Sequence, residues 1–103
     1  LVTRFPNSTY APDAKKRLVE IVNVLAMHDV QIARYYHARG AHVAALNRAK
    51  QVLETYQTSS AAEHALEVMI EAYKEMGLAE LGHDAERVLR LNYPHSSYLP
   101  ENH

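Results

Sequence analysis

The fold is decided by a short stretch that begins with a tyrosine and ends with a glycine, Tyr36-His37-Ala38-Arg39-Gly40. The same tyrosine and glycine recur as Tyr73 and Gly77, and Tyr56 recurs as Tyr93. The members of each pair are 37 residues apart (36 and 73, 40 and 77, 56 and 93). Because three residue types recur at one period, the sequence predicts an internal repeat, with an unrelated helical bundle as the alternative.

The repeat has the marks of the tetratricopeptide pattern, a helix–turn–helix unit of about 34 residues with small residues, tyrosine, glycine and a terminal proline at fixed offsets. Small residues such as Ala33, Ala45 and Ala49 let paired helices approach closely, and tyrosines fill gaps while keeping a hydroxyl near water. The longer period here places the extra residues in the turns. Such repeats stack into a curved surface that binds another chain.

The apolar residues recur with a period near 3.6 and never 2, which predicts an all-α fold without strands. We expect four helices, at residues 12–39, 42–56, 61–76 and 79–92. Gly40 and Gly77 suit the left-handed position just after a helix. Pro12 suits a first helical position. A capping box is expected to open the third helix at Ser60-Ala61-Ala62-Glu63.

Each expected helix has a predicted buried face. Its members are Leu18, Val22, Leu25, Ile32 and Tyr36 in the first helix, Val43, Ala45, Leu46, Ala49, Val52 and Leu53 in the second, Ala62, Ala65, Leu66, Met69, Ile70, Tyr73 and Met76 in the third, and Leu81, Ala85, Val88 and Leu89 in the fourth. Asp29 interrupts the stripe of the first helix, which is therefore either continuous or broken near residues 27–30. Tyr36, rather than its neighbour Tyr35, is expected to face the core.

Length and composition set limits on function. A chain of 103 residues with 48% apolar and 22% charged residues is typical of one globular domain. The net charge of −1 gives no electrostatic footprint for nucleic acid or acidic membranes. The absence of cysteine excludes disulfides and thiolate metal sites, and no apolar run is long enough to span a bilayer.

We expect a single domain over residues 1–103. Within it, residues 1–6 are expected to be the end of a preceding repeat, 12–56 a long repeat, 61–93 the last repeat and 94–103 a tail. Because Leu1–Pro6 read like the last turn of a helix, we also expect the sequence to be part of a longer chain.

Several stretches are more specific than a generic repeat. They are residues 5–17 (FPNSTYAPDAKKR), 25–36 (LAMHDVQIARYY) and 39–49 (RGAHVAALNRA). These stretches resemble the C-terminal part of the BamD family, helical-repeat lipoproteins of the machinery that assembles outer-membrane proteins. The sequence departs from the family at His42, at residues 27–29 and at Gln57, where tyrosine, a glutamate and proline are usual.

The resemblance implies a location and partners. The family lies on the periplasmic face of the outer membrane, held by a lipidated cysteine that is absent from this sequence. It implies a non-catalytic scaffold without a cofactor, which docks on the periplasmic POTRA region of BamA and on the small lipoprotein BamE, with BamC as a further partner. β-Barrel precursors would be contacted mainly by N-terminal repeats that this sequence lacks.

Arg48 is the leading candidate for contact with a partner. It precedes Ala49, a predicted core residue, so its guanidinium should lie at the edge of the packed stripe and could bind a partner carboxylate in bidentate fashion. The alternative is an intramolecular pair, with Glu54 or with an acid on the adjacent helix. Asn47 and Arg39 are further candidates for the same surface.

No catalytic or metal site is predicted. The histidines form no pair at the i, i+3 or i, i+4 spacing that places two ligands on one helix face, although His37 and His42 lie on either side of the Gly40 turn. Glu71 and Glu75 read as a solvated face. Two other functions stay open: a different periplasmic tetratricopeptide adaptor that binds a peptide segment in its concave groove, and a small helical metal-binding or enzymatic domain.

Overall fold

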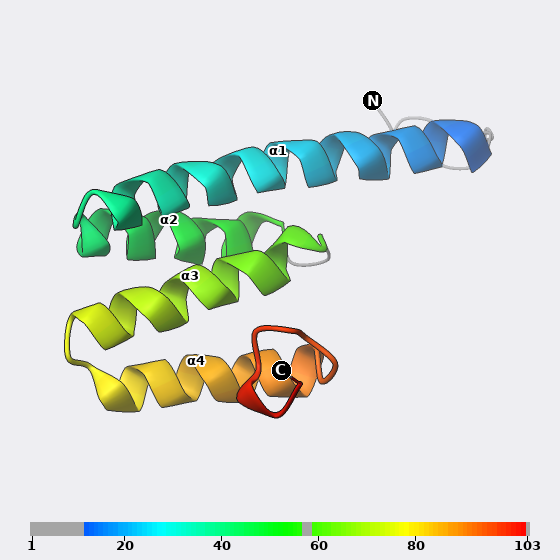
Figure 1. Cartoon of the computed structure of the whole chain (residues 1–103). Coiled ribbons are helices and arrows are strands. Elements are labelled where there is room, and N and C mark those ends of the chain that lie inside the picture. The colour runs from blue at the N-terminus through cyan, green and yellow to red at the C-terminus, as the bar shows by residue number, and fades with distance from the viewer. Residues whose placement is uncertain (1–11, 57–58, 103) are drawn as a thin grey trace.

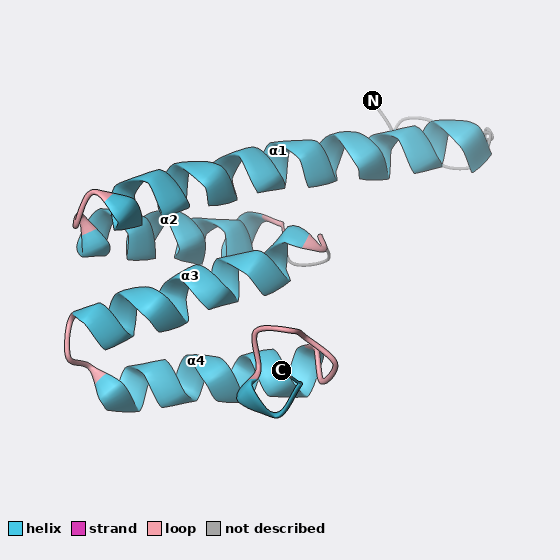
Figure 2. Cartoon of the chain, viewed as in Figure 1, coloured by secondary structure: helices cyan, strands magenta, loops and turns pink. Residues whose placement is uncertain are grey.

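The structure is a computed structural model that describes residues 12–56 and 59–102. It contains the helices α1 (Pro12–Ala38), α2 (His42–Thr55), α3 (Ala61–Glu75) and α4 (Ala79–Asn92), followed by a short 3₁₀ turn, η2 (Pro100–Asn102). No strand occurs in these ranges (Figure 2), which confirms the all-α fold. The predicted end of a preceding repeat, residues 1–6, lies outside the described residues.

The helices stack as two antiparallel hairpins, α1–α2 and α3–α4 (Figure 1). The third helix is central, because α3 packs against each of the other three, whereas α4 packs against α3 alone among the helices. This stacking of hairpins is consistent with the tetratricopeptide-like fold predicted from the 37-residue period.

The two turns that carry the repeated glycines have the same hydrogen bonds. In the first, the Ala41 N–H donates to the Tyr36 carbonyl (2.9 Å), and in the second the Leu78 N–H donates to the Tyr73 carbonyl (2.9 Å). Gly40 and Gly77 have φ angles of 82° and 74°. This is the geometry of a Schellman C-cap, in which the left-handed residue lets the next N–H reach back into the last helical turn. The tyrosine-to-glycine spacing recurs because it encodes this turn twice.

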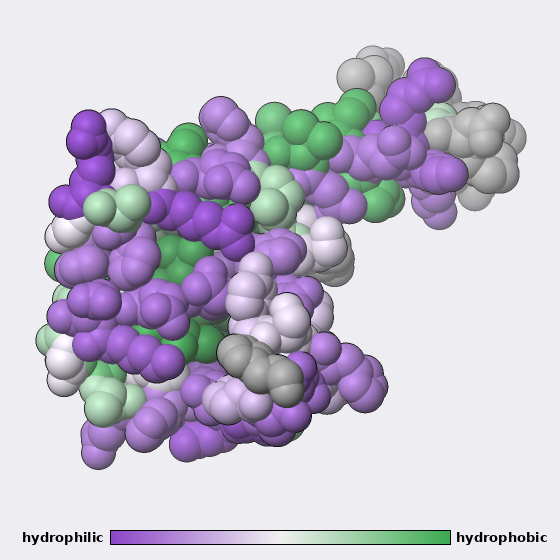
Figure 3. All heavy atoms as spheres, viewed as in Figure 1, coloured by the Kyte–Doolittle hydropathy of each residue, from purple (hydrophilic) through white to green (hydrophobic). Residues whose placement is uncertain are grey.

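The first helix is continuous through Asp29, which settles whether it is one helix or two. Its predicted buried face is wrong in the N-terminal half. Leu18, Val22 and Leu25 are 42%, 38% and 51% exposed, and the fully buried residues of this helix are Ala26, Val30 and Ala33. Most of the N-terminal half of α1 projects beyond the other helices (Figure 1), and only its end, at Asn23, is reached by Ser59 before α3. Figure 3 shows apolar atoms along this projecting segment.

The remaining core follows the prediction more closely. All predicted core residues of α3 are buried except Met76, which is half-buried. Val43, Leu81 and Val88 were expected inside but are 58%, 45% and 42% exposed. They belong to α2, which packs against two helices (α1 and α3), and to α4, which packs against α3 alone, so both bury a narrower face than α3, which packs against three. Leu99, from the C-terminal tail, is fully buried in the same core.

The start of α3 corrects the predicted capping box. Ser60 has helical angles (φ −61°, ψ −19°), and its side chain makes no capping hydrogen bond. The capping role belongs to the buried Ser59, whose Oγ accepts from the Ala61 N–H (3.1 Å) and donates to Asn23 Oδ1 on α1 (2.7 Å). An N-cap residue normally has non-helical angles, which allow its side chain to accept from the free N–H groups of the first turn, and Ser60 has already adopted helical ones.

Candidate partner-binding surface

Of the three residues predicted to contact a partner, Arg39 lies in the α1–α2 turn, and Asn47 and Arg48 lie on α2. Arg48 extends from α2 towards α1, and its Nη1 is 3.7 Å from Asp29 Oδ1. The side chains are 35% and 23% exposed. Arg48 therefore has the adjacent-helix partner that was the alternative to a partner contact, but the separation is longer than that of a strong charge-assisted hydrogen bond.

Arg48 and Asn47 are brought together in an open hollow of about 520 Å³, lined by Tyr36, Ala44, Asn47, Arg48 and Gln51. We call it the Arg48 hollow. Residues 47 and 48 lie three and four positions after residue 44, and residue 51 lies three and four positions after them, so the four share one face of α2. Tyr36, half-buried, closes the hollow from α1. Sequence reasoning missed Gln51 and the tyrosine wall, although the helical spacing from Asn47 was a signal for the first.

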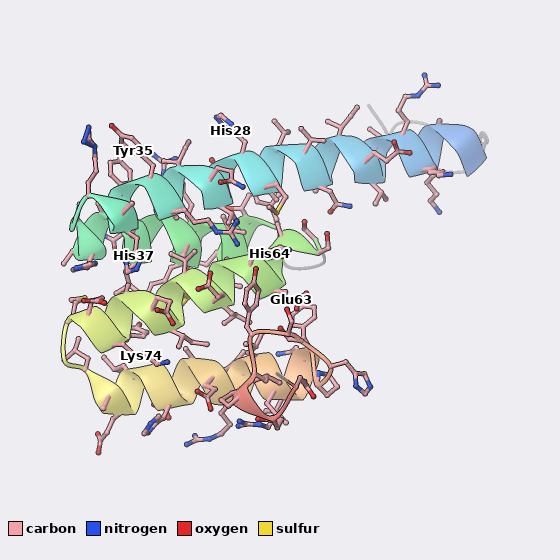
Figure 4. The ribbon with its side chains drawn as sticks, in the orientation of Figure 1. His28, Tyr35, His37, Glu63, His64 and Lys74 are labelled. Atoms are coloured by element: carbon pink, nitrogen blue, oxygen red, sulfur yellow. The ribbon has the colours of Figure 1, made fainter. Side chains whose placement is uncertain are left out.

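Arg39 lies beside this surface rather than in it. Its guanidinium carbon is 4.9 Å from the centre of the Tyr35 ring, a cation–π contact. Tyr35 is 56% exposed, and its ring meets that of Tyr36 edge to face at a centroid distance of 6.0 Å. Figure 4 labels the Tyr35 side chain on α1. The tyrosine pair thus connects Arg39 with the Arg48 hollow, and the core role expected of Tyr36 rather than Tyr35 is confirmed.

The structure brings His37 and His42 together across the Gly40 turn. Their Nδ1 atoms are 3.2 Å apart, so one ring donates a hydrogen bond to the other. In residues 12–56 and 59–102, however, no group of three or more histidine, cysteine, aspartate or glutamate side chains is arranged to hold a metal ion. The pair joins the end of α1 to the start of α2.

A second polar cluster, which the sequence did not predict, connects α1, α3 and the tail. The Tyr98 hydroxyl accepts a hydrogen bond from Arg34 Nη2 (3.1 Å). It lies 2.6 Å from His64 Nδ1. Glu67 lies at the border of this cluster, with Oε1 3.9 Å from Arg34 Nη2. Burial raises the pKa of Glu67, and the nearby Arg34 opposes this effect only in part.

The tail also makes a bidentate ion pair with α4. Arg90 Nε is 2.7 Å from Glu101 Oε2, and Arg90 Nη2 is 3.1 Å from Glu101 Oε1. These hydrogen bonds raise the pKa of Arg90 and lower that of Glu101. Glu86, one turn before Arg90 on α4, shares the same guanidinium at 3.1 Å.

Among the described helices, none combines the length and the apolar character that a membrane-spanning segment needs.

Comparison with known proteins identifies one family. The model of the YfiO family, described as outer membrane lipoprotein, matches residues 1–89.

Curated relatives agree with that match. The chain is 44% identical over 99 residues to the outer membrane protein assembly factor BamD of Neisseria gonorrhoeae, which covers 96% of this chain and 37% of the relative. It is 38% identical over 92 residues to BamD of Vibrio cholerae (89% of this chain, 38% of the relative). It is 40% identical over 92 residues to that of Haemophilus influenzae (89% and 35%). The chain thus spans little more than a third of the length of these relatives.

Proposed function

Because the chain belongs to the YfiO family of outer membrane lipoproteins, we propose that it is a non-catalytic scaffold in the assembly of outer-membrane proteins. Its place would be the periplasmic face of the outer membrane. The relatives are named as outer membrane protein assembly factors, and this chain aligns with them over nearly all of its length. The proposal needs no cofactor and no bond-making step, since a scaffold acts by holding its partners in position.

The proposed docking surface is the Arg48 hollow, with the POTRA region of BamA as its main partner and BamE and BamC as accessory partners. The observation that carries this proposal is the Arg48–Asp29 pair. The separation of 3.7 Å is long for an ion pair, the Arg48 side chain is one-third exposed, and a guanidinium carries five N–H donors. A partner carboxylate could take them in a bidentate contact, and interface anchors of this kind are enriched in arginine.

The projecting half of α1 supports a scaffold in a second way. Six large apolar residues are exposed on it: Leu18, Val19, Ile21, Val22, Val24 and Leu25. An apolar surface of this size fits a further helical hairpin stacked on α1, because each repeat buries its core against its neighbours. The longer relatives have the length for such repeats.

The test is a pull-down of BamA's POTRA region by the full-length protein that carries Arg48→Glu. We expect binding to fall at least about tenfold, since the variant sets a negative charge against the partner carboxylate. Arg87→Glu is the matched control: Arg87 is exposed on α4, far from the hollow in the sequence, and has a similar ion pair with Asp84 (3.2 Å). Circular dichroism should show equal helicity for both variants. If Arg48→Glu binds as well as the control, the docking role of Arg48 is refuted.

A further inference from the structure

The C-terminal tail is held against the helices by three side chains of different chemistry. The Tyr98 hydroxyl lies between Arg34 of α1 and His64 of α3. Since arginine can only donate, the hydroxyl accepts from Arg34 and is free to donate to His64 Nδ1. The His64 ring also meets the Tyr98 ring edge to face, at 5.6 Å and 82°.

The other two contacts are apolar and ionic. The Leu99 side chain, immediately after Tyr98, is fully buried among core residues. Glu101 presents both carboxylate oxygens to Arg90 of α4. The helices therefore bind three groups of the tail: the hydroxyl of a tyrosine, the apolar side chain of the leucine that follows it, and the carboxylate of an acid two residues after the leucine.

The tail keeps its shape by hydrogen bonds of its own. The Tyr98 N–H donates to Ser96 Oγ (3.2 Å). Asn102 Nδ2 donates to the carbonyls of Pro94 (2.9 Å) and Ser96 (3.0 Å). The segment over residues 96–102 is thus a compact turn with internal hydrogen bonds of its own, in addition to its contacts with the helices. Figure 1 shows it folded over the end of α4 towards α3.

Space remains beside the tail. A cavity of about 240 Å³ lies between Ile70 and Lys74 of α3, Glu86 of α4 and Pro100 of the tail. Glu67 and Glu71 also line it. A second segment could begin to contact α3 there before the tail departs.

We propose that the α1–α3–α4 face is a binding site for a short turn-forming peptide segment with a tyrosine–leucine pair followed by an acid, and that residues 96–102 occupy it as an intramolecular competitor. A partner segment of the same chemistry replaces the tail. Because the tail is tethered, its effective concentration at the site is high, so an external segment binds only in proportion to the fraction of molecules whose tail is released. The inference is independent of the docking role of Arg48.

The experiment uses the whole chain and a fluorescent synthetic peptide with the sequence of residues 94–103. Tail release is achieved with Tyr98→Ala combined with Glu101→Arg, which removes the hydroxyl contact and sets like charges against Arg90. We expect the released variant to bind the peptide at least about tenfold more tightly than the unmodified chain does, measured by fluorescence anisotropy. The matched control replaces the exposed tail residues, His95→Ala with Ser97→Ala, and should behave like the unmodified chain.

Two further observations can overturn the proposal. If the released variant keeps its helicity but does not bind the peptide, the tail is a structural cap. If it binds a peptide with alanine in place of tyrosine equally well, the site has no sequence specificity. Hydrogen exchange on the unmodified chain is the second. The Leu99 and Asn102 amides, bonded within the tail, should exchange at least about tenfold faster than buried α3 amides. Exchange at the same rate as α3, or loss of helicity in the released variant, would make the tail part of the core.

Discussion

Arg48 and Asp29 face each other across the α1–α2 interface, with Nη1 of the arginine 3.7 Å from Oδ1 of the aspartate. This relationship explains why an acid interrupts the apolar stripe of the first helix without breaking it. The carboxylate lies at the edge of the buried face, where the arginine of the next helix balances its charge.

The long separation predicts that the pair contributes little to stability. We expect Arg48→Ala and Asp29→Ala each to change the free energy of unfolding by less than about 1 kcal/mol, with a coupling energy in the same range. A double-mutant cycle by urea denaturation measures both. A coupling energy above about 2 kcal/mol would mean that Arg48 is committed to Asp29, which would contradict its proposed availability to a partner.

The two serines before α3 give a matched pair of variants. Ser59→Ala removes the cap on Ala61 and the hydrogen bond to Asn23, both in a buried position, and should destabilise the fold by about 1–2 kcal/mol. Ser60→Ala should stay within about 0.5 kcal/mol, because Ser60 is exposed and makes no capping bond. Thermal unfolding of the two variants separates these outcomes. An equal loss of stability at both positions would instead support the predicted capping box at Ser60.

Glycine-to-alanine substitutions should have opposite effects at two positions. At Gly40, φ is 82°, so a side chain costs about 1–2 kcal/mol. Gly82 lies within α4, and a Cβ there would meet Tyr73 Cβ at 3.6 Å, an ordinary contact. Gly82→Ala should therefore stabilise the protein by about 0.5–1 kcal/mol. Melting temperatures of the two single variants should lie on opposite sides of that of the unmodified chain.

The shifted pKa of Glu67 predicts that the stability of the fold depends on pH. Burial raises its pKa in the folded state above the ordinary 4.5, so the folded protein favours the neutral carboxyl. The stability from this group is fully present below the unfolded pKa and is lost as pH rises through the folded pKa. Glu67→Gln should consequently be more stable than the unmodified chain at pH 7, and the difference should vanish below about pH 4.

The control for that series is Glu75→Gln, a change of the same kind at an exposed side chain of α3 whose charge is not among those that shift the pKa of Glu67. Because Glu101 is retained in all three proteins, its own opposite pH dependence cancels in the comparison. A Glu67→Gln variant that is less stable at pH 7 would mean that the attraction of Arg34 outweighs the cost of burial.

The exposed apolar face of α1 predicts self-association of this 103-residue chain. Ile21→Glu with Leu25→Glu should reduce the oligomer observed by analytical ultracentrifugation without loss of helicity, since both side chains are at least half exposed. Val30→Glu, in the buried part of the same helix, should instead unfold the protein. An unmodified chain that remains monomeric at high concentration would contradict the prediction.

The parts of the fold that local chemistry controls could be predicted from the sequence. Helix ends at Gly40 and Gly77 depend on residues within one turn of each glycine, so their spacing was sufficient. The buried face of α1 was mispredicted because it depends on which elements lie beside it, and in the N-terminal half none of the described helices does. Ser59 was missed by one residue, since the capping box needs a glutamate three residues after the serine, and Glu63 lies at that spacing from Ser60 and not from Ser59.

The candidate surface was predicted only in part for the same reason. Arg48 and Asn47 share a helix face, which periodicity shows, but the position of Asp29 opposite Arg48 requires the pairing of two helices. The polar cluster around Tyr98 is harder to predict from the sequence, because Arg34 and Tyr98 are 64 residues apart. No local pattern distinguishes a tyrosine that returns to the first helix from one that remains in solvent.

The continuity of α1 through Asp29 gives the molecule a lever. A helix of 27 residues is about 40 Å long and one of 14 residues about 21 Å, so roughly half of α1 extends past its partner α2. A tilt of about 10° at the α1–α2 contact would move the free end of such an overhang by roughly 3–4 Å. A small rotation of α1 around Arg48 and Asp29 would therefore produce a larger displacement of whatever packs on the projecting half of α1.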